Sequence, residues 1–313
     1  MKLVSVIIPL YNKGKYISRA LDSVLKQSFQ NYTIIIIDDG STDDGPKIVK
    51  AYDDPRVFLI QQENKGVGSA RNRGIHESSS KYIAFLDADD EWLPSYLSES
   101  YQALENNMDC SVCISGSYQD FSNDVLGRKD VNVVNILKSL GASIVNGAWE
   151  IDRNISDINI KYILNFFNVN TVFAYRDVLL ESGGFCENSN YGEDYYLWLT
   201  LLMNYRIYRN PVPLAWYHDA ASELNGSYAV RHVEAFLCYP DEIRERCPSE
   251  KKEILERFFA IYALQSAHNR ISVGKQDDVE YLMNNFPKMK QYSLFSYIKL
   301  IIKLKLNTLA LYP

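Results

Sequence analysis

Short apolar runs alternate with amphipathic stretches along the N-terminal third of the chain. Apolar runs without polar alternation are typical of strands in the middle of a parallel sheet, and here they occupy residues 4–9, 33–37, 57–60 and 82–86. Between them, apolar residues recur every three or four positions, which predicts helices over residues 15–27, 46–52 and 68–77. This alternation predicts an α/β fold, a doubly wound and mostly parallel sheet with helices on both faces.

Polar residues follow three of these four strands. Tyr11 comes after the first strand, Asp38 and Asp39 end the second, and the acidic stretch 87–90 ends the fourth. In doubly wound sheets, ligands bind beyond the carboxyl ends of the strands. The topology therefore predicts that these residues meet at one edge of the sheet and form a site there.

The fourth strand ends in three carboxylates within four positions, Asp87, Asp89 and Asp90. Unpaired charge at the end of a buried strand is costly unless a cation compensates it. Carboxylate oxygens suit hard divalent ions, which usually reach a protein together with substrate phosphates. The alternative is an acidic helix N-terminus, with Asp89 or Asp90 capping a helix that starts near Pro94. The shared sheet edge favours the metal–diphosphate site.

Composition narrows the class of protein. The 313 residues carry a formal net charge of -6, which argues against a general nucleic-acid binder. No run of about 18 apolar residues and no signal peptide is recognised, so neither a membrane span nor export is expected. The five cysteines are scattered and odd in number, which favours a reducing, cytoplasmic location.

Four motifs occur in order within the first hundred residues, and a fifth begins at Tyr191; they read VSVIIPLYNKGKYISRALDSVLKQSF, IIIDDGSTD, NKGVGSARNRGI, YIAFLDADDEW and YGEDYYLWLTL. Together they resemble glycosyltransferase family 2. The resemblance implies a Rossmann-like A-type glycosyltransferase fold and an inverting enzyme that uses a nucleotide-diphospho-sugar. A lone D-x-D would be a weak signal, whereas five ordered motifs are specific.

The resemblance implies that Pro9 and Tyr11 flank the nucleotide base, with the Tyr11 ring stacked on it. Asp39 would accept a hydrogen bond from the N3–H of uracil, because a carboxylate suits an imide donor. Asp38 is the second candidate for this contact. The alternative is that Asp38 and Asp39 are turn residues that cap the next helix.

The resemblance makes Asp87-Ala88-Asp89 the D-x-D motif. Asp89 would hold a divalent cofactor ion, Mn²⁺ or Mg²⁺, and Asp87 would contact the ribose or the water shell of that metal. Arg71 would support the diphosphate or the acids, although it also fits a surface helix arginine. His218 follows a strand-like stretch at 214–217 and either approaches the diphosphate or metal or has only a structural role.

Glu193 and Asp194 precede an apolar helix predicted over residues 195–203. Carboxylates at a helix N-terminus are favoured by the helix dipole in any protein, which explains one of them well. The resemblance implies that one, Asp194 before Glu193, is the general base. It would deprotonate the acceptor hydroxyl as that oxygen attacks the anomeric carbon, in one step with inversion.

The pattern is weaker after residue 116, and after residue 222 it becomes mostly helical, with a long amphipathic helix over 251–271. A short strand at 131–134 and a short helix at 136–140 are also predicted. The expected division is a catalytic domain at 1–222, with a donor half at 1–115 and an acceptor half at 116–222, and a mainly helical extension at 223–313.

The segment 294–311 combines many Leu and Ile residues with Lys299, Lys303 and Lys305. Such a basic amphipathic helix suits peripheral contact with the inner face of a membrane near a lipid-linked acceptor. Packing on the catalytic domain or on a homodimer partner is the alternative, and the sequence favours it slightly.

The hypothesis is therefore a metal-dependent transferase that moves a single sugar from a nucleotide-diphospho-sugar, UDP-linked, to a glycan or lipid-linked acceptor in surface polysaccharide assembly. A processive synthase is not expected, because no Gln-x-x-Arg-Trp sequence occurs. One alternative is a non-catalytic nucleotide-sugar or glycan-binding module on the same fold, which the intact acids disfavour. Another is a nucleotidylyltransferase, which needs a basic glycine-rich loop after the first strand that Pro9–Asn12 does not provide.

Overall fold

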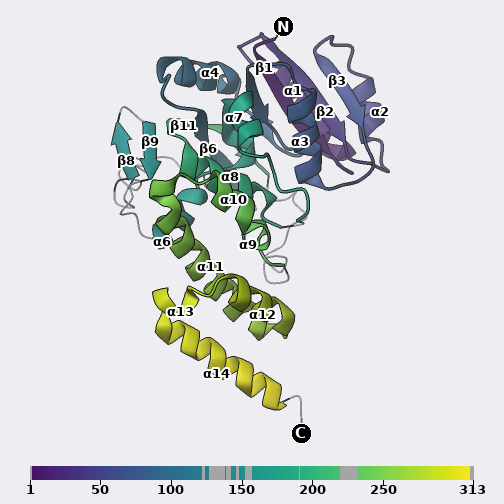
Figure 1. Cartoon of the computed structure of the whole chain (residues 1–313). Helices are drawn as coiled ribbons and strands as arrows, with labels where there is room; N and C mark the ends of the chain where they lie inside the picture. Colours follow the sequence, from purple (N-terminus) through teal and green to yellow (C-terminus); the bar gives the residue numbers. More distant parts are fainter. Residues whose placement is uncertain are drawn as a thin grey trace.

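In the computed structural model, the described residues are 2–121, 124–126, 138, 142–145, 148–151, 157–189, 191–218 and 232–310. They form one large sheet with helices on both faces, followed by a helical C-terminal arm (Figure 1). The strand expected at 131–134, most of the helix expected at 136–140 and the domain boundary expected at residue 222 lie outside the described residues.

Eleven strands form this sheet among the described residues. They are β1 (Val4–Leu10), β2 (Tyr32–Asp38), β3 (Val57–Gln61), β4 (Tyr82–Phe85), β5 (Glu91–Trp92), β6 (Val112–Phe121), β7 (Asp124–Leu126), β8 (Ala142–Val145), β9 (Ala148–Ile151), β10 (Val172–Tyr175) and β11 (Ile207–Tyr217). The main order is β3-β2-β1-β4-β10-β6-β11-β9-β8, with β5 paired to β11 and β7 paired to β6.

The strand directions differ between the two halves of the sheet. Strands β3, β2, β1 and β4 are parallel, as predicted. Strand β10 then lies antiparallel between β4 and β6, and β11 is parallel to β6. The sheet is therefore mixed, because its second half is not built from repeated strand–helix–strand units.

The helices are α1 (Gly14–Leu25), α2 (Gly45–Lys50), α3 (Val67–Glu77), α4 (Tyr96–Asn106), α6 (Asp157–Leu164), α7 (Arg176–Glu181), α8 (Glu193–Asn204), α9 (Ala235–Cys238), α10 (Pro240–Arg246), α11 (Lys252–Ser272), α12 (Gln276–Asn285), α13 (Met289–Tyr292) and α14 (Leu294–Ala310), with 3₁₀ turns η1 (Val169–Thr171) and η3 (Ser249–Lys251). Successive β1 side chains point to opposite faces of the sheet. Val6 and Ile8 pack in the core that contains α1, whereas Ile7 packs with Ile75 of α3.

The C-terminal helices continue the core on the α3 side of the sheet. Phe236 of α9 packs against Phe258 and Phe259 of α11, in the same cluster as Trp198 of α8. Beyond α11, helices α12–α14 extend away from the sheet (Figure 1). No helix in the described part of the chain combines the length and the apolar character that a membrane crossing needs.

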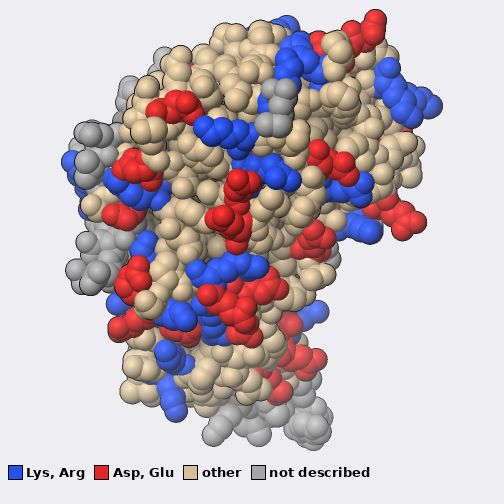
Figure 2. All heavy atoms as spheres, turned by 45° about the horizontal axis from the view of Figure 1, so that its top comes forward, with Lys and Arg blue, Asp and Glu red and all other residues tan. Residues whose placement is uncertain are grey.

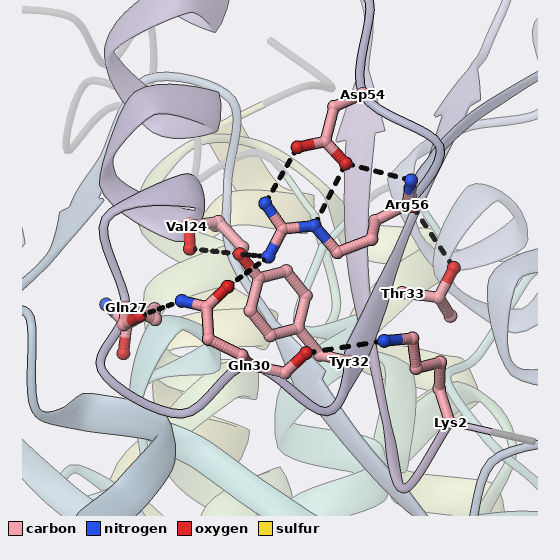
Figure 3. Close-up of polar contacts among 8 residues, drawn as sticks. All are labelled: Lys2, Val24, Gln27, Gln30, Tyr32, Thr33, Asp54 and Arg56. Carbon is pink, nitrogen blue, oxygen red and sulfur yellow. Dashed lines mark hydrogen bonds and ion pairs between the residues drawn. The ribbon is translucent and has the colours of Figure 1, made fainter.

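A polar network ties β2 to β3 at their amino ends (Figure 3). Arg56 donates from Nε and Nη2 to the Asp54 carboxylate at 2.9 and 2.7 Å. Its Nη1 donates to Gln30 Oε1 at 2.6 Å and to the Tyr32 hydroxyl at 2.8 Å. This network lies at the end of the strands opposite the polar edge predicted from the sequence, so its role is to hold the sheet together.

Candidate functional site

The carboxyl ends of β1, β2 and β4 meet at one edge of the sheet. Leu10 pairs with Asp38 in the parallel register of β1 and β2, and Ile7 pairs with Phe85 of β4. The segments that leave these strands therefore start side by side. The prediction that Tyr11, Asp39 and the acidic stretch 87–90 lie at this edge rested on the same topology.

The turn after β1 is joined to the turn after β2. Asn12 has a φ of 52°, the left-handed region that Asn tolerates, and its Oδ1 accepts from the Thr42 N–H at 2.8 Å. The Tyr11 ring beside it is 49% exposed, while Pro9 is buried within β1 opposite Ile37. A half-exposed ring above a rigid turn is well placed to stack on a planar ligand.

Asp38 and Asp39 are both buried, and each is held by hydrogen bonds within the protein. Asp38 accepts from the Ser41 N–H at 3.0 Å and from Gln61 Nε2 at 2.9 Å, as a turn residue would. Asp39 accepts three hydrogen bonds from the segment leading into α3; the donors are Gln62 Nε2 at 2.8 Å and the N–H groups of Lys65 and Gly66, each at 2.9 Å. Asp39 therefore fixes the start of α3.

Arg71 of α3 lies at the centre of the site. Its Nη2 donates to Asp87 Oδ1 at 2.8 Å, and its Nη1 donates to Glu193 Oε1 at 3.0 Å. The guanidinium is buried, 5.2 Å from the centre of the Phe185 ring, and its two acidic partners raise its pKa against the effect of burial. The reading of Arg71 as a surface arginine is thus wrong, and one cation joins the acidic cluster after β4 to the start of α8.

Asn72, the next residue of α3, holds the segment before α8. Its Nδ2 donates to the Phe185 carbonyl and to Glu187 Oε1, and its Oδ1 accepts from the Phe185 N–H, each at 2.8 Å. Gly184 has a φ of +71°, and a Cβ there would lie 2.4 Å from Asn72 Oδ1. A Cβ on Gly68 would similarly lie 2.8 Å from the Cys186 carbonyl oxygen. Close packing of α3 against this segment therefore requires both glycines.

Asp89 lies beside two basic residues of the β1–α1 region. Its carboxylate pairs with Lys13 Nζ at 3.1 Å, and its carbonyl oxygen accepts a hydrogen bond from Arg19. Burial and the neighbouring Asp87 charge raise the Asp89 pKa above its ordinary value. Ala88, between the two acids, is buried. The two carboxylates of the D-x-D motif are thus close enough to repel, and each has a cation beside it.

Asp90 has a structural role that the sequence did not suggest. Its carboxyl accepts from the His218 N–H at 2.8 Å and from the Asn170 side chain, and it is 1% exposed. Burial, with the Asp87 charge next, raises its pKa to about 8. Helix α4 begins after an N-cap at Ser95. The alternative that Asp90 caps the next helix is therefore wrong, because its oxygens accept hydrogen bonds from His218 and Asn170 instead.

The His218 ring contacts Glu91 rather than the acidic pair of the D-x-D motif. Its Nε2 lies 3.1 Å from Glu91 Oε1, and the ring is largely buried. Its backbone bond to Asp90 nevertheless places residue 218 beside the cluster.

Glu193 and Asp194 form the first turn of α8, after Gly192 with a φ of +72°. Glu193 is engaged by Arg71, whereas Asp194 Oδ1 accepts from the Tyr195 N–H at 2.8 Å. Burial, with the Glu193 charge next, raises the pKa of Asp194 to about 7. One of the two acids is thus paired with a cation, and the pKa of the other is raised towards neutral pH.

The comparisons with known proteins agree with this geometry. The profile of the family described as glycosyl transferase family 2 matches residues 5–184, more than half of the chain. The chain belongs to glycosyl transferase family 2. The matched region contains β1–β4, the D-x-D motif, Arg71 and both glycines of the Gly183–Gly184 turn. The family predicted from the sequence is confirmed.

The chain is similar in sequence to two glycosyltransferases of Escherichia coli. WfgD of Escherichia coli, a UDP-Glc:alpha-D-GlcNAc-diphosphoundecaprenol beta-1,3-glucosyltransferase, is 30% identical over 66% of this chain and 72% of its own length. The uncharacterized glycosyltransferase YibD of Escherichia coli (strain K12) is 45% identical over 35% of this chain and 33% of its own length. The chain thus spans about a third of the length of YibD.

Solved structures share the fold. S. aureus TarS 1-349, crystallised with UDP-GlcNAc, superposes with a TM-score of 0.69 at 19% identity, covering 92% of this chain and 81% of that one. The mannosyltransferase PcManGT from Pyrobaculum calidifontis, in complex with GDP-Man and Mn2+, gives a TM-score of 0.56 at 18% identity, covering 96% and 87%. The predicted A-type glycosyltransferase fold is confirmed.

The donor set at this edge fits one kind of metal site. Among the described residues, no group of three or more His, Cys, Asp or Glu side chains is arranged to hold an ion. Asp87 and Asp89 are each paired with a basic side chain, Arg71 and Lys13 respectively, whose positive charge a metal ion would replace or add to. Mg²⁺-type ions are commonly bound by one or two carboxylates plus substrate phosphates and water. The residues thus fit an ion that arrives with a diphosphate.

Three residues of the site were missed from the sequence. Asn72 belongs to the motif NKGVGSARNRGI and Lys13 to the turn after β1, but no role was predicted for either. Asn170, in η1, accepts from the Asp87 N–H at 2.6 Å and donates to Asp90. The motif and the turn gave signals for the first two. No local pattern identifies Asn170, because it acts on residues about eighty positions earlier.

Proposed function

We propose that this chain is an inverting glycosyltransferase that moves a single sugar from a nucleotide-diphospho-sugar to a hydroxyl of a glycan or lipid-linked saccharide, in surface polysaccharide assembly. The observation that carries the proposal is Arg71, which binds Asp87 and Glu193 at once. These acids belong to the two motifs expected on the donor and acceptor sides. A single buried cation thus holds both sides of a two-substrate site in register.

A UDP-linked donor is supported by residues at the ends of β1 and β2. Tyr11 presents a half-exposed ring, and Asp39 lies next to it because its N–H donates to the Leu10 carbonyl at 2.8 Å. Asp39 Oδ2 accepts one hydrogen bond within the protein, and a carboxylate oxygen can accept two. It can therefore accept a second from the N3–H of uracil. The named activity of WfgD, which uses UDP-Glc, supports the same choice.

Asp89, together with Asp87, would hold Mn²⁺ or Mg²⁺ when the donor is bound. The ion would act as a Lewis acid that neutralises the charge on the departing nucleotide diphosphate. Lys13 pairs with Asp89, and its ammonium would become available to the diphosphate once the acid binds a metal. The Mn2+ in PcManGT supports a divalent ion on this fold.

Asp194 is the better candidate for the general base. Efficient proton transfer needs a group with a pKa near the working pH, and the pKa of Asp194 is raised to about 7. Glu193 is already paired with Arg71 at 3.0 Å, so its charge serves to position that cation. Asp194 would take the proton from the acceptor hydroxyl. As it does so, the hydroxyl oxygen attacks the anomeric carbon of the donor sugar, and the bond between that carbon and the nucleotide diphosphate breaks.

Calorimetric titration of UDP, with and without Mn²⁺, tests the donor assignment. We expect UDP to bind at least about tenfold more tightly when Mn²⁺ is present. In Asp89→Asn, the UDP affinity with Mn²⁺ should fall to that of the parent protein without metal. Folded protein that binds UDP in neither condition would refute the assignment. Binding without transfer of sugar from any UDP-sugar to water or glycan would instead indicate the non-catalytic module.

A further inference from the structure

Helix α14 packs on the protein through one face only. The side chains of Tyr297, Leu300 and Leu304 join the main core. On the same side, the His268 ring of α11 contacts the Ser296 carbonyl oxygen at 2.9 Å. These contacts attach α14 to α11 and account for the packing expected from the sequence, but they use only part of the helix surface.

Another face of α14 exposes large apolar side chains to solvent. Leu294, Phe295, Ile298 and Ile302 are 60%, 71%, 47% and 52% exposed. At about 100° per residue, the four lie within an arc of roughly 100°, away from the packed residues. We call these four residues the α14 apolar stripe. A contiguous exposed stripe of this kind marks an interaction surface, whereas a single exposed apolar residue would not.

The segment that contains the stripe is strongly basic, unlike the rest of the chain. Residues 286–313 hold five lysines and none of the 39 Asp and Glu residues, although the whole chain has a net charge of -6. Lys299 lies beside the stripe, with Nζ 4.4 Å from the centre of the Phe295 ring, and Lys303 is exposed one turn further on. Elsewhere, acidic and basic side chains are mixed over the face shown in Figure 2.

We propose that α14 binds the surface of an anionic lipid membrane, lying in the plane of the interface. The stripe would enter the boundary between head groups and acyl chains, and Lys299 and Lys303 would extend to the lipid phosphates, as basic amphipathic helices do. No described helix has the length and apolar character needed to cross a membrane. In Figure 1, α14 lies at the opposite end of the molecule from β1, β2 and β3.

Self-association through the stripe is the competing explanation, and charge argues against it. A two-fold symmetric dimer places the same patch of both copies together. The lysines of both copies, Lys299 and Lys303, would then gather at one interface, with no acidic residue in the segment 286–313 to compensate them. An anionic lipid surface complements both the apolar and the basic side chains. Lipid binding needs no sugar donor, so it can be measured independently of the proposed transfer reaction.

Flotation of the full chain with vesicles tests the proposal. We expect the protein to float with vesicles that contain phosphatidylglycerol and not with vesicles of phosphatidylcholine alone, and to dissociate as salt is raised. The double substitution Lys299→Gln with Lys303→Gln should weaken binding roughly 25-fold, since each lysine near such a surface contributes a factor of about five. Phe295→Ser with Ile298→Ser should weaken it roughly tenfold or more.

Matched variants remove the same groups elsewhere on the surface. Lys26→Gln with Lys50→Gln, and Phe58→Ser with Val212→Ser, should leave flotation unchanged, because these exposed residues lie outside α14. Equal binding to neutral and anionic vesicles, or equal binding by the α14 and control variants, would overturn the proposal. The proposal would also be overturned if the parent protein binds no vesicle but sediments as a dimer, and if Phe295→Ser with Ile298→Ser dissociates that dimer.

Discussion

Replacing Arg71 with methionine tests the central contact of the site. The side chain is buried and binds Asp87 at 2.8 Å and Glu193 at 3.0 Å. Methionine keeps much of the apolar volume against Phe185 but leaves two carboxylates without their cation. Removing one partner of a buried ion pair typically costs about 3–5 kcal/mol of unfolding free energy. Because the Asp87 side chain keeps 26% exposure, we expect the lower end, about 3 kcal/mol.

The loss of unfolding free energy in Arg71→Met should change with pH in a predictable direction. The pKa of Asp194 is raised to about 7 in the folded protein, above its ordinary 3.8, and the Arg71 charge lowers it. A raised acid pKa means that the folded state binds the proton more tightly, so stability increases as pH falls below 7. Without Arg71 the Asp194 pKa rises further. The loss in Arg71→Met should therefore be largest near about pH 8 and smaller near about pH 5.5.

Urea unfolding, followed by tryptophan fluorescence at both pH values, measures this difference. Arg73→Met is the matched control, because Arg73 is on the same helix but its pair with Glu77 is exposed. We expect the control to lose less than about 1 kcal/mol. If Arg71→Met stays within about 1 kcal/mol of the parent protein at both pH values, the reasoning about a buried, shared cation is refuted.

Three further predictions concern Asp194 and Asp54. Asp194→Asn should reduce sugar transfer roughly 100-fold or more with UDP affinity nearly unchanged; retained transfer would move the base to Glu193. In the parent protein, kcat/KM should rise with pH and reach half its maximum near 7, where Asp194 loses its proton; a flat profile from pH 6 to 8 would contradict this. The Arg56 guanidinium lowers the pKa of Asp54 to about 2 from 3.8, so its stabilising effect is present above 3.8 and lost as pH falls through 2. Asp54→Asn should cost about 1 kcal/mol at neutral pH and progressively less as pH falls through about 2, whereas Asp53→Asn, on an exposed neighbour, should have little effect at either pH.

The parallel half of the sheet was predictable because its signals are local. Buried parallel strands are apolar on both faces, so β1, β2 and β4 appear as nearly uninterrupted apolar runs. Strand β3 lies at the edge of the sheet and is only partly buried, but it is also a short apolar run. The boundaries of all four strands lie within two residues of those predicted. The second half lacks such runs. Strand β11 begins at Ile207, although only residues 214–217 look like a strand, because Arg209 donates to the Ser115 carbonyl and Asn210 to Glu99. Tertiary partners satisfy polar groups that interrupt the local pattern.

The sequence by itself determined that Asp38, Asp39 and the acids after β4 lie at the sheet edge, since the alternation of strands and helices places the carboxyl ends of the parallel strands there. It could not decide their charges or partners. Arg71 and Glu193 are 122 positions apart, and only the folded chain shows that one buried guanidinium serves Asp87 and Glu193 together. Likewise, Asp90 proved to be an acceptor for His218 rather than a helix cap. Hydrogen bonds and ion pairs depend on distances of about 3 Å in space, which spacing along a chain does not encode beyond a few residues.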